Sequence, residues 1–337
     1  MSPRLPRIGR PSGSPAAVLP TGRPAPGPGA LGGPPPSLST DKAEVVLKRL
    51  QLLITRKLDG LLQGDYLGLL PGSGSEAGES REYRPGDDVR RMDWPVTART
   101  TVPHVRQTVA DRELETWICL DLSASLDFGT ARCEKRDLAF AAAAAITYLT
   151  VRGGNRIGAV VTNGQQTVRM PARGGRINAQ GMLRRIADTP RAGTGAATDL
   201  AAAVDLLNRP PRRRGMAVVI SDFLADPAWE WPMRKLAVRH DVLAIEIVDP
   251  RELALPEVGI LTVADPETGR LHEVQTSSKS LREAYARAAA EQRDAISAAM
   301  RHAGAAHLRL RTDSDWLLDI VRFVAASRRG RSRGTTR

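Results

Sequence analysis

The sequence has few cysteines, no long apolar run and no recognisable export signal. Only Cys119 and Cys133 occur in 337 residues, too few for a disulfide framework or a cysteine metal cluster. The longest apolar stretch, residues 138–151, falls short of the ~20 residues that a membrane-spanning helix needs, and is expected to be a core helix. The N-terminus contains several Arg residues but lacks the apolar segment of a secretory signal. These absences predict a cytoplasmic protein without a membrane span.

The formal net charge of +12 is concentrated at the two ends of the chain. Residues 1–40 contain four Arg and no acidic residue, and residues 328–337 contain five Arg and no acidic residue. The remainder carries only +3, which is not typical of a nucleic-acid-binding face. We therefore expect no nucleic-acid binding by the fold itself. Binding of the two basic tails to nucleic acid or another anionic surface remains the alternative function.

Composition divides the chain into four segments. Residues 1–40 are rich in Pro, Gly, Ser and Ala and are predicted to be disordered, because they offer little apolar surface to bury. Residues 41–110 contain apolar side chains at helical spacing between Val45 and Leu62, followed by a charged segment expected to form turns and short strands. Residues 111–326 form the main predicted domain, and residues 327–337 form a basic tail.

Short apolar runs alternate with helical segments through the main domain, a pattern typical of an open, mostly parallel α/β sheet covered by helices on both faces. The predicted strands are residues 115–120, 156–161, 167–170, 217–220, 242–248 and 307–311. The predicted helices are residues 134–151, 177–187, 200–207, 229–239, 281–303 and 314–325. Turn chemistry around residues 265–269 also predicts a β-hairpin insertion near residues 259–276.

Three polar clusters stand at predicted strand ends or helix starts. Asp121, Ser123 and Ser125 follow the first strand of the main domain, Thr198 precedes a helix, and Asp222 follows the fourth strand. In open α/β sheets, ligands bind outside the carboxyl ends of the strands. Carboxylate and hydroxyl oxygens suit a hard divalent cation such as Mg²⁺. Each cluster alone is typical of turns and helix caps, but together they predict a five-residue metal site with one position open to solvent.

These five residues, in this order, resemble the metal-ion-dependent adhesion site (MIDAS) of von Willebrand factor type A domains. The wider chain, over residues 42–325, resembles the bacterial domain-of-unknown-function-58 family. The matching motifs are residues 81–94 (REYRPGDDVRRMDW), 128–130 (FGT), 221–223 (SDF) and 239–242 (RHDV). Residues 67–80 depart from the family pattern, since a segment richer in Arg and Phe is expected there.

The resemblance implies that the chain works with a MoxR-type AAA+ ATPase in a chaperone-like or complex-maturation role. Because no catalytic base accompanies the predicted site, we expect a non-enzymatic protein-binding module. The metal, Mg²⁺ or alternatively Mn²⁺ or Ca²⁺, would then bind a carboxylate of the partner protein at its open position. The chain itself lacks the Lys-Ser/Thr ending of a phosphate-binding loop in residues 193–198, so nucleotide binding is expected of the partner only.

Two other interpretations of the polar residues are less well supported by the sequence. A metal-dependent hydrolase needs a general base, and the five His residues are expected to be exposed or at strand edges, without a catalytic triad. The acidic group Asp87, Asp88 and Asp93 is interleaved with Arg residues and is expected to form an ion-pair network, with Trp94 buried beside it.

Overall fold

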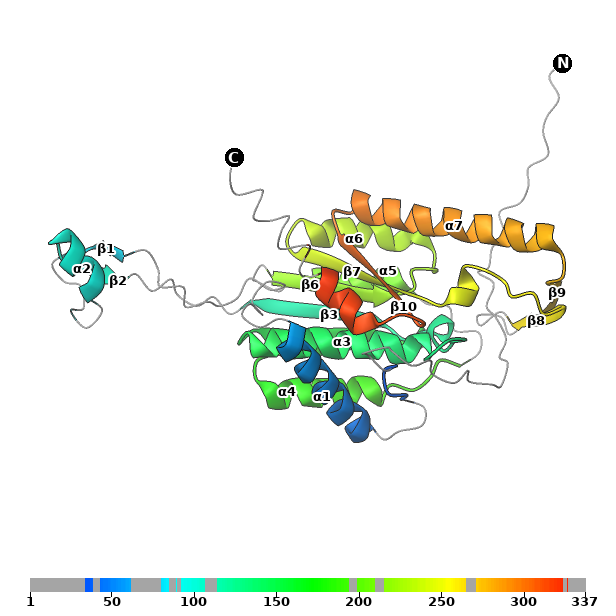
Figure 1. Ribbon diagram of the computed structural model, residues 1–337, viewed down its shortest axis with the longest axis horizontal. Coiled ribbons are helices and arrows are strands. Elements are labelled where there is room, and N and C mark those ends of the chain that lie inside the picture. The colour runs from blue at the N-terminus through cyan, green and yellow to red at the C-terminus, as the bar shows by residue number, and fades with distance from the viewer. Residues whose placement is uncertain are drawn as a thin grey trace, which may run out of the picture.

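The computed structural model describes residues 34–38, 43–61, 80–84, 89, 92–106, 114–193, 199–209, 215–264, 271–323 and 326. A six-stranded sheet with the order β10-β7-β6-β3-β4-β5 forms its centre (Figure 1). All neighbouring strands are parallel except β4 and β5, which are antiparallel. The strands are β3 (Glu115–Asp121), β4 (Arg156–Thr162), β5 (Thr167–Arg173), β6 (Gly215–Ser221), β7 (Asp241–Val248) and β10 (Ala306–Arg311). The predicted fold class, an open and mostly parallel α/β sheet, is confirmed.

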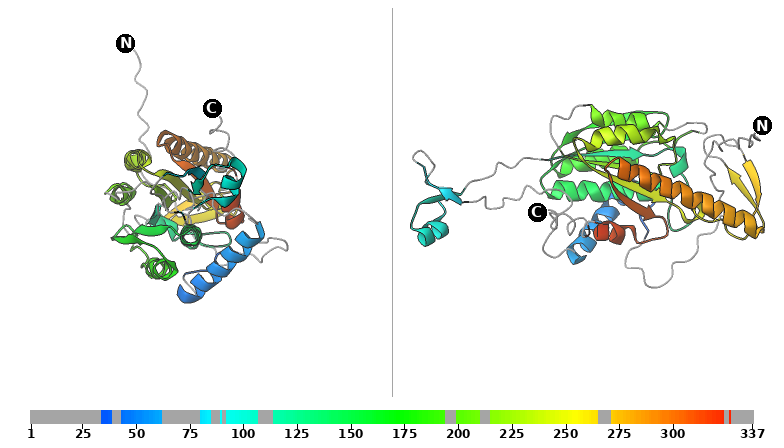
Figure 2. Two further views of the ribbon diagram at one scale, coloured as in Figure 1. Left: turned by 90° about the vertical axis from the view of Figure 1, so that its left-hand side faces the viewer. Right: turned by 90° about the horizontal axis from the view of Figure 1, so that it is seen from above.

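Helices cover both faces of the sheet (Figure 2). On one face, Ile118 and Leu120 of β3 belong to a core cluster that also includes side chains of α1 (Ala43–Leu61), α3 (Lys135–Arg152) and α4 (Arg176–Ala187). On the other face, Trp117 and Cys119 belong to a cluster with α5 (Leu200–Asn208), α6 (Glu230–Ala237) and α7 (Lys279–His302). Because both faces are covered, the inner strands β3, β4, β6 and β7 are apolar almost throughout, whereas the edge strand β10 alternates.

The Ala-rich helix α3 is buried on nearly all sides. Every residue from Leu138 to Thr147 is buried, since α3 lies between the sheet and the helices α1 and α4. Small Ala side chains let the helix approach its neighbours closely. The prediction of a core helix at residues 138–151 is confirmed. Among the described residues, no helix combines the length and apolarity needed to cross a membrane.

A small unit precedes the sheet in the chain, and its structure differs from two predictions made from the sequence. Strands β1 (Ser80–Glu82) and β2 (His104–Arg106) pair antiparallel and flank the helix α2 (Trp94–Thr100), which was not predicted because seven residues show no sustained periodicity. The Asp93 side chain caps α2 by accepting from the Val96 amide at 3.3 Å. Trp94 is 66% exposed, so its predicted burial is wrong: α2 buries none of its residues. Asp87 and Asp88 lie outside the described residues.

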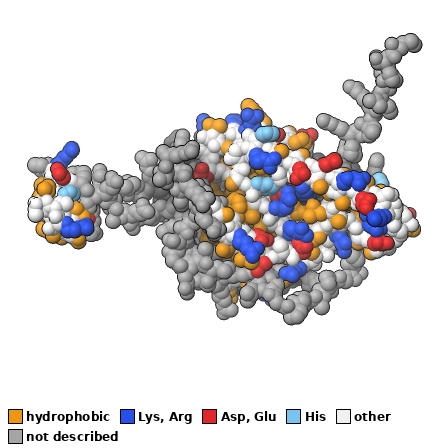
Figure 3. Space-filling model, turned by 45° about the horizontal axis from the view of Figure 1, so that its top comes forward, with side chains coloured by type: hydrophobic (Ala, Val, Ile, Leu, Met, Phe, Trp, Pro, Cys, Tyr) orange, Lys and Arg blue, Asp and Glu red, His pale blue; other side chains and the backbone are white. Residues whose placement is uncertain are grey.

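Residues 34–38 are the described part of the expected disordered segment, and they are held on α3. Pro35 and Pro36 are buried, and the Leu38 amide donates to Asp137 Oδ1 at 2.8 Å. Strands β8 (Ile260–Ala264) and β9 (Leu271–Gln275) form the predicted hairpin next to the start of α7 (Figure 1). Basic and acidic side chains are interspersed over the body in Figure 3, in line with the nearly balanced charge outside the tails.

Candidate metal centre

The predicted site lies where the sheet reverses its strand order. From β3 the chain continues outward through β4 and β5, then returns to place β6 on the other side of β3, followed by β7 and β10. The carboxyl ends of β3 and β6 are therefore neighbours, and their loops lead in opposite directions. Such a switch point leaves a crevice between the two loops, the usual ligand position in an open α/β sheet. Asp121 ends β3, and Asp222 follows β6 directly.

The loop after β3 turns several oxygens toward β6. Asp121 Oδ1 accepts from the Ser123 amide at 2.9 Å, and Asp121 Oδ2 accepts from the Ser221 hydroxyl at 2.7 Å. The hydroxyl oxygens of Ser123 and Ser125 lie 3.2 Å apart. A short 3-10 helix, η3 (Ala124–Leu126), starts within this motif and is anchored by the buried Leu126. The Asp-x-Ser-x-Ser spacing therefore brings three oxygen-bearing side chains to one end of the sheet.

Asp222 contributes the second buried carboxylate. Its Oδ1 accepts from the Leu224 amide at 3.2 Å, and its Oδ2 accepts from Lys135 Nζ at 2.8 Å. The Ser125 hydroxyl also stabilises its charge. The structure thus brings together four of the five predicted residues, Asp121, Ser123, Ser125 and Asp222. The fifth, Thr198, lies outside the described residues.

The two carboxylates have opposite pKa shifts. Burial, with the nearby charge of Asp222, raises the pKa of Asp121 to about 6. Burial also opposes the charge of Asp222, but the Lys135 ammonium beside it outweighs burial and holds the pKa of Asp222 below its ordinary value. At neutral pH both groups are therefore mostly ionised, and Asp121 is the one whose charge is poorly compensated.

The backbone after Asp222 is held in an unusual conformation. Phe223 has a φ of 55°, a left-handed value that is rare for a bulky residue. Its amide donates to the Ser221 hydroxyl at 3.0 Å, and its ring packs edge-on against Trp229 at a centroid distance of 5.2 Å. Packing of the aromatic ring offsets the backbone strain. The sharp turn directs the Asp222 carboxylate toward the β3 loop and α3.

The segment that leads to Thr198 passes over the same end of the sheet. The Arg136 guanidinium on α3 donates to the backbone oxygens of Thr189 and Pro190, and Arg191 pairs with Glu134 at 2.6 Å. Beyond residues 194–198, Asp199 caps α5 by accepting from the Ala202 amide at 2.8 Å. Residues 189–191 are thus held against the start of α3, and Asp199 caps the start of α5. The predicted contribution of Thr198 itself stays a prediction.

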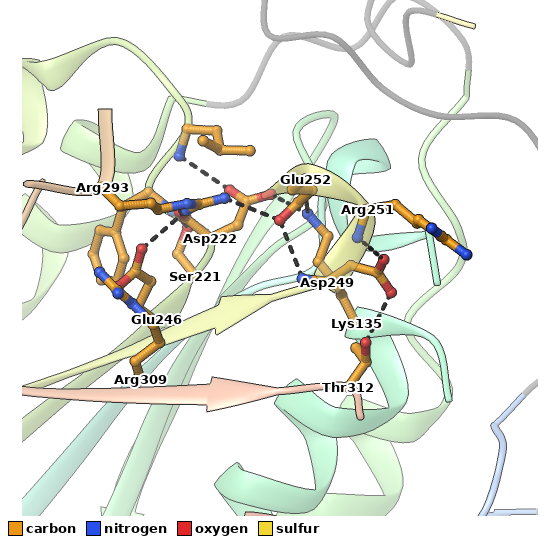
Figure 4. A network of polar contacts seen from close by, with 12 residues as sticks. Lys135, Ser221, Asp222, Glu246, Asp249, Arg251, Glu252, Arg293, Arg309 and Thr312 are labelled. Atoms are coloured by element: carbon orange, nitrogen blue, oxygen red, sulfur yellow. Dashed lines mark hydrogen bonds and ion pairs between the residues drawn. The ribbon is translucent and has the colours of Figure 1, made fainter. Parts of the chain in front are cut away.

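A chain of buried ion pairs extends from Asp222 to the edge of the sheet (Figure 4). Lys135 also pairs with Glu252, and Glu252 Oε2 accepts from Arg293 of α7 at 2.9 Å. Arg293 binds Glu246 Oε1 at 2.9 Å, and Arg309 Nε binds Glu246 Oε2 at 2.7 Å. The network therefore connects the candidate metal site with α3, α7, β7 and β10.

A further buried carboxylate, Asp249, joins three loops at this end of the sheet. It accepts from the Thr130 amide at 2.9 Å, from the Thr312 hydroxyl at 2.8 Å and from the Arg251 amide at 2.9 Å. Within the same β3–α3 loop, Gly129 approaches the backbone of Cys133 and Glu134 so closely that an added Cβ would lie 2.4 Å from the Cys133 carbonyl oxygen. These contacts fix the loop that carries Ser123 and Ser125.

The donor set fits a hard divalent ion. Two carboxylates and two hydroxyls from adjacent loops supply oxygen ligands. A carboxylate has about four lone-pair positions, so the observed hydrogen bonds leave positions on Asp121 that can bind an ion. Two like charges are also buried beside each other, and burial together with the charge of Asp222 raises the pKa of Asp121, an effect that a bound cation would oppose. Asp121, Ser123, Ser125 and Asp222, with Thr198, would hold such an ion.

Several residues of this region were not predicted. Lys135, Glu252 and Arg293 follow no short motif, because their partners are distant in sequence. Lys135 gave no distinct signal either, because it is followed by the charged residues Arg136 and Asp137 at the start of α3. Of the five His residues, His240 is buried, which corrects the expectation of exposed or strand-edge histidines: it lies just before β7, and burial lowers its pKa.

Comparison with known proteins identifies relatives in mycobacteria. A family model described as "Protein of unknown function DUF58" matches residues 79–295. Uncharacterized proteins of Mycobacterium bovis (strain ATCC BAA-935 / AF2122/97) and Mycobacterium tuberculosis (strain ATCC 25618 / H37Rv) are each 58% identical over 301 residues, covering 88% of this chain and 95% of the relative. A protein of Mycobacterium avium is 52% identical over 162 residues, covering 48% of this chain and 95% of the relative.

Solved structures give a more distant likeness. The conserved hypothetical protein BatB from Bacteroides thetaiotaomicron is 16% identical, with a TM-score of 0.40 over 64% of this chain and 98% of that one. An aerotolerance-related membrane protein from Bacteroides fragilis NCTC 9343 is also 16% identical, with a TM-score of 0.37 over 63% of this chain and 99% of that one. At these values the likeness carries no functional information.

Proposed function

The chain belongs to the DUF58 family of proteins of unknown function, and we propose that it is a non-enzymatic, metal-dependent protein-binding module. The metal, Mg²⁺ or alternatively Mn²⁺ or Ca²⁺, is held by Asp121, Ser123, Ser125, Thr198 and Asp222. The observation that supports this proposal is the meeting of two buried carboxylates and two hydroxyls at the switch point between β3 and β6.

The arrangement favours docking over catalysis. Both oxygens of Asp121 already accept hydrogen bonds, from Ser123 and Ser221, and Asp222 is paired with Lys135. If both carboxylates also coordinate the ion, neither is left to act as a general base for an incoming water. An ion bound here keeps an open coordination position toward solvent, and a carboxylate of a partner protein is the ligand class that fits it. By family resemblance, the proposed partner is a MoxR-type AAA+ ATPase.

Metal binding is the first test of the proposal. We expect the EDTA-treated full chain to bind one Mn²⁺ or Mg²⁺ in isothermal titration calorimetry, and the Asp121→Asn variant to bind at least about tenfold more weakly, because it removes one ionised ligand. Asp205→Asn is the matched control, since the half-exposed Asp205 on α5 contacts Lys235 and Asn208 and no residue of the proposed site. Equal affinity of wild type and Asp121→Asn would contradict the proposed site.

Partner binding is the second test. Purified MoxR-type ATPase from the same genome is mixed with immobilised wild type, Asp121→Asn or Asp205→Asn, with Mg²⁺ or with EDTA. We expect retention by wild type and Asp205→Asn in Mg²⁺ only. Retention that is unaffected by EDTA and by Asp121→Asn would show that the partner binds elsewhere on the chain.

A further inference from the structure

Lys135 is an unusual residue at the start of α3. Its side chain is 1% exposed, and its ammonium lies between two carboxylates, donating to Asp222 Oδ2 at 2.8 Å and to Glu252 Oε1. A buried ammonium is costly unless it is fully paired. The first turn of a helix is also an unfavourable place for a cation, because the helix dipole is positive there. Two compensating carboxylates are therefore needed to keep this one charge in place.

Glu252 alone does not compensate the charge of Lys135. Its second carboxylate oxygen is bound by Arg293 at 2.9 Å, so Glu252 has another buried cation as a partner. Asp222, by contrast, has Lys135 as its one ion-pair partner among the described residues. The distinct effect of Lys135 is thus to place a positive charge on a predicted metal ligand.

The position of this charge has a direct consequence for a bound ion. Asp121 and Asp222 carry two negative charges when ionised, and Lys135, which also pairs with Glu252, offsets part of the charge on Asp222. These two ligands therefore neutralise a divalent ion only in part. A positive site with an open coordination position favours an anionic ligand over a neutral one.

Resting on the metal site proposed above, we propose that Lys135 competes with a divalent ion for Asp222 and so weakens binding of the ion. Stable metal binding then depends on an anionic carboxylate ligand from the partner. Lys135 lies beside the ion rather than coordinating it, so it acts as a positioning residue. In this arrangement metal and partner carboxylate bind cooperatively, and the metal alone binds weakly.

The test is titration of Mn²⁺ into the EDTA-treated full chain by calorimetry at pH 8, with and without 50 mM acetate as the carboxylate probe. We expect Lys135→Met to bind Mn²⁺ at least about tenfold more tightly than wild type, since a nearby positive charge is removed. Lys135→Gln, which keeps a hydrogen-bond donor, gives the same result if Lys135→Met does not fold. Lys279→Met, on the exposed start of α7, is the matched control and binds as wild type does.

Two further measurements separate the possible outcomes. Acetate is expected to tighten Mn²⁺ binding by wild type more than by Lys135→Met, and Glu252→Gln is expected to weaken Mn²⁺ binding, because Lys135 is then committed to Asp222. Equal Mn²⁺ affinities of wild type and both Lys135 variants would overturn the role of Lys135 while leaving the metal site intact. Absence of Mn²⁺ binding in every variant would overturn both proposals.

Discussion

At the scale of single residues, the charge of Asp121 lowers the stability of the metal-free protein but serves the proposed metal site. Its carboxylate is buried beside Asp222, and its pKa is about 6 in the folded protein against 3.8 for an exposed Asp. Because the folded state holds the proton more tightly than the unfolded state, ionisation of Asp121 destabilises the metal-free protein. This cost is absent below pH 3.8, grows as the pH rises and is complete above about pH 6.

Asp121→Asn is therefore expected to stabilise the metal-free protein at neutral pH. The amide keeps the shape, and its oxygen accepts from the Ser123 amide. We expect a gain of about 1–3 kcal/mol in the free energy of unfolding at pH 7.5 in EDTA, measured by urea denaturation. The gain is expected to shrink at pH 5. A variant that is less stable than wild type at pH 7.5 would show that the Asp121 charge is already compensated in the metal-free protein.

At the scale of secondary-structure elements, the long helix α7 is attached to the sheet by charge as well as by apolar packing. Ile296 and Met300 pack into the core, while Arg293 donates to the Asp222 carbonyl oxygen at 3.1 Å and binds Glu246 and Glu252. Glu246 is fully buried on β7, so its charge depends on His307, Arg309 and Arg293. The apolar periodicity predicted α7, but the charged attachment required the packed structure.

Arg293→Met is expected to destabilise the protein strongly. Removing one partner of a buried ion pair typically costs about 3–5 kcal/mol, and we expect the lower end because Arg309 still faces Glu246. Arg287→Met, at an exposed position on the same helix, is the control and is expected to change the free energy of unfolding by less than about 0.5 kcal/mol. Similar stabilities of the two variants in urea denaturation would refute an energetic role for this network.

At the scale of the whole molecule, net charge and proposed site belong to different parts of the chain. The two Arg-bearing ends carry nine positive charges, and the rest of the chain carries +3. The described residues of the candidate metal site lie at the carboxyl ends of β3 and β6, far in sequence from both ends of the chain. Binding through the tails would fall steeply with salt and be indifferent to the metal, while docking at the site would depend on the metal.

Removal of residues 1–33 and 327–337 separates these two kinds of binding. We expect the shortened chain to keep wild-type Mn²⁺ affinity in calorimetry and Mg²⁺-dependent retention of the ATPase. We also expect it to lose any salt-sensitive binding to a fluorescent DNA duplex in anisotropy measurements. Loss of ATPase retention with unchanged Mn²⁺ affinity would instead favour partner binding through the tails.

The sequence by itself determined the fold class and the order of strands in the main domain. Short apolar runs between helical segments predicted all six strands of the sheet. The four inner strands are continuously apolar because both their faces are buried, whereas the edge strands β5 and β10 alternate. It also placed Asp121, Ser123, Ser125 and Asp222 at strand ends, where parallel strands bring loops together. The sequence did not predict the short helix α2 or the exposure of Trp94, because seven residues without a buried face leave no periodic pattern.

Only the tertiary structure decided the electrostatic surroundings of those residues. Lys135 precedes Asp222 by 87 residues, and Arg293 is 41 residues from Glu252, so no local pattern joins them. Their pairing depends on which strands are neighbours and on how deeply the loops are buried. Burial lowers the effective dielectric constant and makes each unpaired charge expensive, so the positions of Lys135 and Arg293 determine how much negative charge remains at the candidate metal site.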